Sequence, residues 1–302
     1  MTDDIKFDEL LTEQRNPRSL HLDRLSTEEI VLLINEEDAT VAGAVRRAIP
    51  AIARAADLVA EHLRLGGRVF YVGAGTSGRI GWLDAVEWGP TFGIEPDRIR
   101  VLVAGGVSAS VEASSELEDD PDLGASDLQA HRPTRTDVVI GIAASGRTPY
   151  VLGALRAARD AGCAVVSVCN NPSPPMEGLA DVAIVVCTGP EVLAGSTRMK
   201  AGTAQKMVLN MISTAAMVRL GKVYGNLMVD LRPLNRKLWA RACRIVAEAA
   251  GVSGEEAACL LERADRNVKV AIVMAVRGCD PQEAAERLAR AGGFVRRALE
   301  DP

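Results

Sequence analysis

Five short apolar runs between residues 68 and 187 limit the possible folds of this chain more than any other feature. They are 68–72 (RVFYV), 99–104 (IRVLVA), 137–143 (DVVIGIA), 164–169 (AVVSVC) and 182–187 (VAIVVC). Each is rich in β-branched residues and apolar at consecutive positions, as expected for strands buried on both faces of a parallel sheet. Helix-like segments such as 148–161 lie between them. The pattern predicts an α/β fold with a doubly wound, five-stranded parallel sheet.

Helical patterns flank this sheet domain, which we expect over residues 45–230. Residues 1–44 predict an N-terminal arm, extended to about residue 24, and a helix that begins at the S-x-x-E capping box of Ser26 and Glu29. A second helix is expected from Thr40 to Leu65, where Gly66-Gly67 ends it.

Residues 240–302 predict a small C-terminal helical domain. Ser253 and Asp280 each stand three residues before a Glu, which is a helix-start pattern, and Gly292-Gly293 interrupts the last helical region.

Composition excludes several classes of function. The net charge of -5 over 302 residues argues against a nucleic-acid partner. The acidic N-terminus has no apolar signal region and no stretch is long enough to span a membrane, so we expect a cytoplasmic protein. The six cysteines form no C-x-x-C pair, and most are expected to be buried in a reducing compartment. With three histidines and no HExxH-type spacing, a zinc site is not expected.

The loop after the first run, Gly73-Ala-Gly-Thr-Ser-Gly78, matches the pattern G-x-G-x-x-G. That pattern also marks dinucleotide-binding sites, which require an acidic residue at the end of the second strand to hold the ribose. Here the second strand runs into Ala104-Gly105-Gly106 instead. The hydroxyls of Thr76 and Ser77, with the backbone at Gly75, better suit a phosphate or sugar oxygen.

A second hydroxyl-rich loop, residues 144–149 (ASGRTP), follows the third run. Thr148 suits a helix N-cap and Pro149 the first helical position, so helix amides should point into this loop. Ordinary capping would explain these two residues without a ligand, but it leaves Ser145 and Gly146 unexplained. The expected phosphate contacts here are Ser145, Gly146, Arg147 and Thr148.

A third polar cluster, residues 189–206, precedes a long helix. Its polar density after a buried strand exceeds what a turn requires, with Glu191, Ser196, Thr197, Arg198 and Lys200 close together.

Two glutamates fall on helix faces that should be apolar. Ile80, Leu83 and Glu87 form one stripe of a helix that starts near Gly78. A helix from Ser108 would likewise put Glu118 on one face with Val107 and Val111. A carboxylate on a core-facing stripe costs free energy unless it is paired or used, which suggests an acid/base pair. The alternatives are a salt bridge to an Arg for Glu87 and a solvated acidic helix end for Glu118.

The motifs GAGTSGR, LDAVE, IAASGRTPYV, GPEVLAGSTRMKAGTAQKMVLN and GKVYGNLMVD together resemble the N-acetylmuramic acid 6-phosphate etherases. This family belongs to the sugar isomerase (SIS) domain group, as does the glucokinase regulatory protein. The resemblance runs from TEQRNP to GGFVRRAL, nearly the whole chain. It implies an SIS fold and a cytoplasmic lyase.

The reaction implied is cleavage of the D-lactyl ether of a sugar phosphate, with no metal or organic cofactor, by a homodimer with sites near the subunit interface. The family's catalytic glutamates correspond to Glu87, assigned as the acid toward lactate, and Glu118, assigned as the base at C2. Glu116 is the competitor for the second role. Lys222, Tyr224 and Asn226 line the site or form a structural turn.

Three rivals remain: a sugar-phosphate-sensing regulator, a transcriptional regulator and an aldose–ketose isomerase. The first has two SIS domains in the glucokinase regulatory protein, and this chain has room for one. The second needs a basic helix-turn-helix, which the acidic N-terminus lacks. The third does not account for a full-length match.

Overall fold

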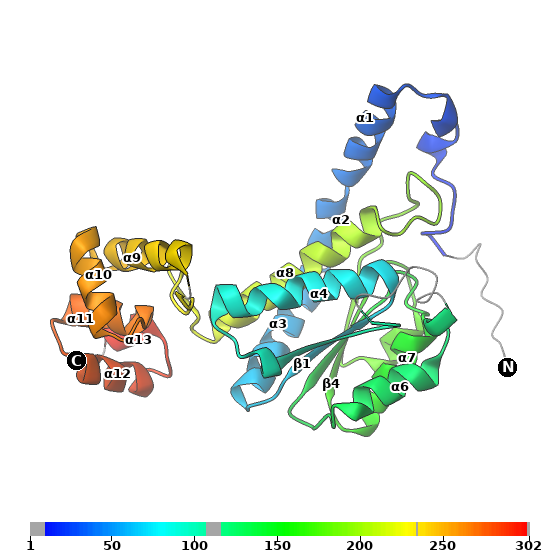
Figure 1. Cartoon of the computed structure of the whole chain (residues 1–302). Helices are drawn as coiled ribbons and strands as arrows, with labels where there is room; N and C mark the ends of the chain where they lie inside the picture. The colour runs from blue at the N-terminus through cyan, green and yellow to red at the C-terminus, as the bar shows by residue number, and fades with distance from the viewer. Residues whose placement is uncertain (1–9, 107–115, 234, 301–302) are drawn as a thin grey trace. The chain divides into compact units, whose positions relative to one another are not determined.

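The computed structural model describes residues 10–106, 116–233 and 235–300. The chain divides into two compact units (Figure 1). The first comprises Met1–Ala85 and Asp97–Ser213, and the second Val86–Pro96 and Thr214–Pro302. The helices α4 (Gly75–Phe92) and α8 (Lys200–Arg219) each begin in the first unit and end in the second.

A five-stranded parallel sheet forms the centre of the first unit (Figure 1). Its strand order is β2-β1-β3-β4-β5, with parallel pairing throughout. The strands are β1 (Val69–Gly73), β2 (Ile99–Val103), β3 (Val138–Ile142), β4 (Ala164–Cys169) and β5 (Val182–Val185). The predicted doubly wound α/β fold is confirmed, and each strand falls within one residue or two of the run that predicted it.

Burial within the sheet follows strand position. Every residue of β1, β3 and β4 is buried, as their continuous apolar sequences predict. The edge strands β2 and β5 are only partly buried. The prediction of two covered faces therefore holds for the three central strands.

Helices cover both faces of the sheet. On one face α7 (Pro149–Asp160) packs Tyr150, Val151 and Leu155 against Phe70 and Val139. Beside it lies α6 (Pro121–Ala130) (Figure 1). On the other face the α4 side chain Asp84 accepts a 2.6 Å hydrogen bond from the hydroxyl of Tyr71 on β1.

The N-terminal helices agree with their sequence signals, with one exception. Helix α1 (Thr27–Asp38) begins at the predicted capping box, in which Ser26 and Glu29 bond each other's backbone. The expected single helix over 40–65 is instead two, α2 (Val41–Arg47) and α3 (Ile49–Arg64), because Pro50 cannot continue a helix and occupies the first turn of the second. The described part of the arm is not extended, since it contains the 3₁₀ turns Pro17–Ser19 and Leu22–Arg24.

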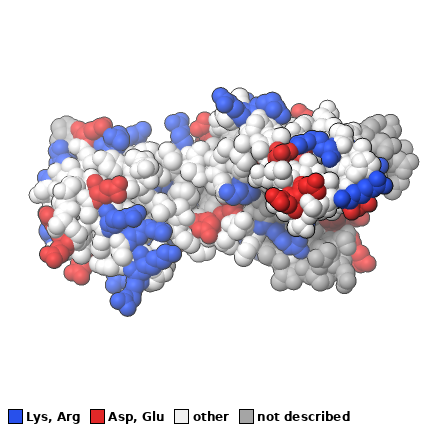
Figure 2. All heavy atoms as spheres, turned by 90° about the horizontal axis from the view of Figure 1, so that it is seen from above, with Lys and Arg blue, Asp and Glu red and all other residues white. Residues whose placement is uncertain are grey.

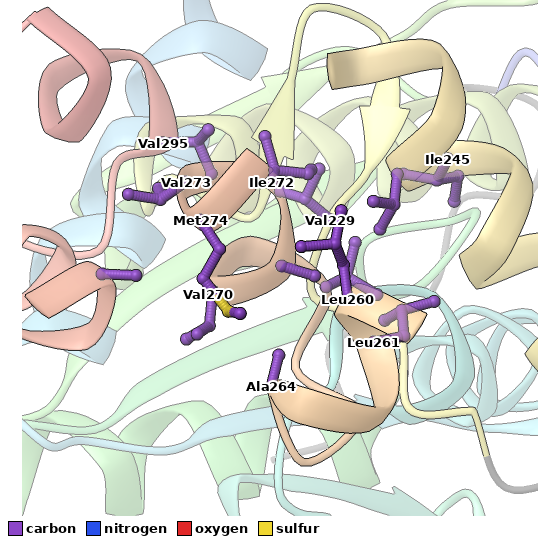
Figure 3. Packing of buried hydrophobic residues seen from close by; sticks show 14 of the residues in the cluster. Val229, Ile245, Leu260, Leu261, Ala264, Val270, Ile272, Val273, Met274 and Val295 are labelled. Atoms are coloured by element: carbon purple, nitrogen blue, oxygen red, sulfur yellow. The ribbon is translucent and has the colours of Figure 1, made fainter. Parts of the chain in front are cut away.

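The second unit has its own core (Figure 3). A two-stranded hairpin of β6 (Val223–Tyr224) and β7 (Leu227–Met228) precedes a series of helices, and seven residues of α11 (Val268–Arg277) are buried. The helices are α9 (Arg236–Ala250), α10 (Gly254–Arg263), α11 (Val268–Arg277), α12 (Pro281–Arg290) and α13 (Val295–Glu300). Ser253 and Asp280 cap α10 and α12 as predicted. The three-part division of the chain by sequence stays a prediction.

Basic and acidic side chains are interspersed on the face seen in Figure 2. Within the described residues, no helix is long and apolar enough to cross a membrane.

The expectation of mostly buried cysteines is wrong: two are buried, Cys163 and Cys169, three are half-buried and Cys259 is exposed.

Candidate active site

A cleft of about 290 Å³ opens at the carboxyl ends of β1 and β3. These strands are neighbours, but the chain leaves β1 toward β2 on one side and reaches β3 on the other. Ligands of open α/β sheets bind at such a reversal of strand order. The cleft is lined by Thr12, Glu13, Ala74, Gly75, Thr76, Ser77, Glu118, Ile142, Ala143, Ala144, Ser145, Thr148 and Thr197.

The loop after β1 lines the cleft, and its glycines allow the chain to turn tightly from the strand into helix α4. Helix α4 begins at Gly75, whose φ of +51° favours glycine. A Cβ at Gly78 would lie 2.8 Å from the side chain of Val103 and 2.9 Å from the carbonyl oxygen of Gly73. The first-turn amides of α4 have no intrahelical partners, so this helix start favours an anion beside Thr76 and Ser77.

The loop after β3 is held by a side chain. Ser145 Oγ accepts a 3.1 Å hydrogen bond from the amide of Arg147. Gly146 has a φ of +67°, and a Cβ there would lie 2.3 Å from Pro174. Helix α7 then begins at Pro149, as predicted, with Thr148 at the N-cap position.

Thr148 does not cap this helix with its side chain. Ordinary capping therefore does not use the hydroxyl, which lines the cleft together with Ser145. Gly146 and Arg147, also predicted as contacts, are not among the described lining residues and shape the loop behind it.

Glu118 lines the cleft and is held there by the same helix start. Its carbonyl oxygen accepts a 3.0 Å hydrogen bond from the amide of Tyr150 in the first turn of α7. Burial, and then the nearby negative charge of Asp119, raise the pKa of the Glu118 carboxyl above its ordinary value. Its competitor Glu116 is exposed and is not a described lining residue. Most of the helix expected from Ser108 falls on residues 107–115, outside the described residues.

Glu87 lies on α4 within the second unit, and its side chain is exposed. The prediction that Ile80, Leu83 and Glu87 form a core-facing stripe is wrong, since Leu83 is 50% exposed. Glu87 is not among the described residues that line the cleft of the first unit.

Helix α4 instead packs through small and polar residues. A Cβ at Gly81 would lie 3.1 Å from both Tyr71 and Ile142 of the sheet. One turn on, buried Asp84 accepts hydrogen bonds from Tyr71, Asn210 and Ser213. A polar network thus takes the place of the expected apolar contact.

Neutral donors dominate the cleft. None of its described lining residues is a Lys or Arg, so hydroxyls and helix-start amides are the groups present to hold an anion. Across the described parts of the chain, no group of three or more His, Cys, Asp or Glu side chains is placed to hold a metal ion.

The polar cluster 189–206 is partly structural. Buried Glu191 accepts hydrogen bonds from the amides of Lys200 and Ala201, which caps the start of α8. The Lys200 ammonium pairs with Glu37 at 2.6 Å, and both side chains are buried. Arg198 is exposed and Ser196 half-buried, whereas Thr197 lines the cleft.

Thr12 and Glu13 line the cleft but were not predicted to do so. They come from the N-terminal arm, far from the rest of the cleft in sequence. The signal in the sequence was the polar run TEQRNP, whose residue types are typical of turns.

A larger hollow of about 440 Å³ lies in the second unit. It is lined by Pro233, Asn235, Arg236, Trp239 and Arg266, and the Arg266 guanidinium lies 5.6 Å from the centre of a Trp239 ring. Its described lining residues include no carboxylate, so the smaller cleft is the better candidate.

The run GKVYGN forms the β6–β7 hairpin of the second unit. Lys222 pairs with Asp230 at 3.2 Å, and Arg296 lies over the ring of Tyr224. These contacts favour the structural alternative for Lys222 and Tyr224. No described contact of Asn226 bears on either alternative.

Two family models match the chain. One describes the glucokinase regulatory protein N-terminal SIS domain and matches residues 51–159. The other describes the SIS domain and matches residues 107–215. Both cover the cleft-forming loop after β3.

Curated relatives match almost the whole chain. It is 55% identical to the N-acetylmuramic acid 6-phosphate etherase of Geobacillus thermodenitrificans, over 97% of this chain and 100% of that protein. Identity to the protein of the same name from Mycolicibacterium smegmatis is also 55%, over 96% and 97% of the two chains. For the Salmonella typhi protein of that name it is 53%, over 96% and 98%.

Solved structures share the fold at low identity. The phosphoheptose isomerase of Neisseria gonorrhoeae superposes with a TM-score of 0.51 at 17% identity, over 63% of this chain and 98% of that chain. The Francisella tularensis enzyme gives 0.50 at 18% identity, over 64% and 100%.

Proposed function

Because the chain belongs to the N-acetylmuramic acid 6-phosphate etherase family, we propose that it cleaves the D-lactyl ether at C3 of N-acetylmuramic acid 6-phosphate. The products are N-acetylglucosamine 6-phosphate and D-lactate, and the role is catabolism or recycling of cell-wall amino sugars. The observation that carries this proposal is 55% identity along 97% of the chain.

The phosphate group is proposed to bind between the starts of α4 and α7. Thr76, Ser77, Ser145 and Thr148 supply hydroxyls there, and both helix starts favour an anion. The substrate is thereby oriented with its 6-phosphate at the sheet and its ring toward Glu118.

Cleavage then proceeds as an elimination followed by an addition. In the open-chain sugar the C1 aldehyde acidifies the proton on C2. Glu118 removes this proton, and the C2–H electrons form an enolate with its negative charge on the C1 oxygen. The enolate then forms the C2–C3 double bond as the C3–O bond breaks and Glu87 protonates the leaving lactate oxygen. Water adds to C3 of the unsaturated aldehyde, and C2 regains a proton. The aldehyde accepts the developing charge, with loop donors in support.

The environment of Glu118 supports its role as the base. A raised pKa makes the ionised carboxylate a stronger base than an ordinary glutamate. No comparable observation supports Glu87, whose role as proton donor rests on the family resemblance.

We also propose a cytoplasmic homodimer. Trp82 and Leu83, on the first-unit part of α4, are 43% and 50% exposed, and burying them in a subunit contact would remove apolar surface from water. All six cysteines are free, as in proteins of a reducing compartment.

The proposed reaction is tested with N-acetylmuramic acid 6-phosphate in ¹⁸O-labelled water. We expect D-lactate release and one label at C3 of the product. Release without label would reject elimination and re-addition. Binding without any release would favour the sugar-phosphate-sensing alternative.

A further inference from the structure

Two carboxylates line the cleft, and the proposed reaction uses only one of them. Glu13 stands beside Thr12 in the N-terminal arm, more than 100 residues before Glu118. Its place in the cleft depends on how the arm is attached.

Thr12 anchors the arm to the loops around the cleft. The side-chain amide of Asn171 donates to Thr12 Oγ1 at 3.0 Å, and its carbonyl oxygen accepts from the Thr12 amide at 3.4 Å. The same Asn171 donates at 2.9 Å to the carbonyl of Ala144, a lining residue. Thr12 and Asn171 are each 1% exposed, so this attachment is buried.

A second anchor follows Glu13 in the chain. The side-chain amide of Asn16 donates to Glu37 at 2.9 Å and to the carbonyl of Pro190 at 3.3 Å. Glu37 also pairs with buried Lys200. Glu13 is therefore fixed from both sides, by Thr12 and by Asn16.

The loop opposite leaves space for the Glu13 carboxylate. The amide of Gly195 donates to the carbonyl of Thr12 at 3.1 Å. Gly195 has a φ of +77°, and a Cβ on it would lie 3.0 Å from Glu13 Oε2. Among the described residues, no side chain forms a hydrogen bond or ion pair with the half-buried Glu13 carboxylate.

A carboxylate with unused acceptor capacity repels a phosphate but accepts hydrogen bonds from O–H and N–H groups. We propose that Glu13 is a specificity-determining residue, which accepts a hydrogen bond from a hydroxyl or amide N–H of the sugar. This inference rests on the proposed function, because it takes the ligand to be a phosphosugar held by its phosphate at the two helix starts. Glu13 then separates sugar phosphates from phosphate species that lack such a donor.

The test is calorimetric titration of the full chain with N-acetylglucosamine 6-phosphate and, separately, with inorganic phosphate. In Glu13→Gln we expect affinity for the sugar phosphate to fall about tenfold, because hydrogen bonds to charged groups are the strong ones. Phosphate affinity should be unchanged or slightly higher, since a negative charge has been removed. In turnover, KM for N-acetylmuramic acid 6-phosphate should rise about tenfold with a smaller change in kcat.

Glu28→Gln is the matched control, since Glu28 is exposed on α1 and outside the cleft. Gly195→Ala is a second variant, because its Cβ would crowd the Glu13 carboxylate, and affinity for the sugar phosphate should fall more than affinity for phosphate. Equal losses for both ligands, or unchanged sugar-phosphate affinity in Glu13→Gln, would overturn the inference. If the wild type itself releases no D-lactate, the proposed function fails first; if it does and Glu13→Gln matches it, only the role of Glu13 fails.

Discussion

The loop after β1 and the loop after β3 both turn a buried strand into a helix beside the same cleft, but they are held differently. The first is shaped by missing side chains: Gly78 packs against the backbone of Gly73 with no room for a Cβ. The second also has no room for a Cβ, at Gly146, but a side chain holds it as well, through the bond from the Arg147 amide to Ser145 Oγ. The first loop should therefore tolerate little change, whereas the second allows binding and stability to be altered separately.

The two loops also differ in how they relate to the proposed acid and base. Helix α4, after the first loop, carries Glu87 in its own sequence. Helix α7, after the second, holds Glu118 through a backbone bond from Tyr150. Substitutions of Glu87 and of Glu118 therefore test the roles proposed for the two carboxylates separately.

The largest effect is expected from Glu118→Gln. Without the base, kcat should fall on the order of 10²–10⁴-fold. Exchange of the C2 proton with solvent deuterium, followed by NMR, should be lost together with lactate release. Glu116→Gln is the matched control and should behave like the wild type. If Glu116→Gln loses activity instead, the base has been misassigned.

Glu87→Gln should lose lactate release on the same order, 10²–10⁴-fold, but keep C2 exchange. The reason is that the base remains while the leaving oxygen no longer receives a proton. Parallel NMR and lactate assays on one sample separate the two steps. A near-normal lactate rate would show that Glu87 is not the acid.

Gly78→Ala tests the intolerance of the first loop. We expect about 1–3 kcal/mol of lost stability in urea unfolding, because the new methyl group would overlap Val103 and the Gly73 carbonyl. Gly43→Ala is the control, since nothing lies within 4 Å of a Cβ in that helix and a gain of roughly 0.5–1 kcal/mol is expected. Equal stability of the two variants would contradict the packing account.

Thr148→Val tests the second loop. Its hydroxyl is not used to cap α7, so stability should be unchanged while KM rises about tenfold. Ser145→Ala should raise KM and also cost about 1 kcal/mol, because the Arg147 amide loses its acceptor. A matching loss of stability in both variants would remove the distinction between the two hydroxyls.

The smallest effect concerns pH. A base acts only when deprotonated, so kcat/KM should decline as the pH falls through the raised pKa of Glu118. Asp119→Asn removes a charge that raises this pKa, so the decline should move to lower pH. Asp122→Asn is the control, because Asp122 does not contribute to the shift. A decline that stays in place in Asp119→Asn would show that burial alone sets the pKa.

Local signals predicted most of the fold. The five strands and the helix caps at Ser26, Ser253 and Asp280 depend on residues that lie close together in the sequence. The periodicity of Leu83 and Glu87 led to a wrong prediction, because it assumes that the apolar face of a helix is the buried one. Helix α4 instead buries Asp84, which accepts hydrogen bonds from α8. That network joins residues 126 and 129 positions apart.

The sequence could suggest those residues of the candidate site that follow strand ends. Four lining residues follow strands β1 and β3: Thr76, Ser77, Ser145 and Thr148. The carboxyl ends of parallel strands all lie at one edge of the sheet, where ligands bind. Glu13 could not be found in this way, because only the fold brings the arm to Asn171 and Gly195.

The arm's attachment also sets an order of events during synthesis. Thr12 is made well before its partner Asn171, which lies 159 positions later, and the Glu37–Lys200 pair spans 163 positions. At translation rates of about 5–20 residues per second, the arm waits roughly 8–30 s for the residues that hold it. The cleft is therefore complete only after Asn171 and Lys200 have been made. Thr12 and Glu13, the first of its lining residues to be made, are among the last to reach their final positions.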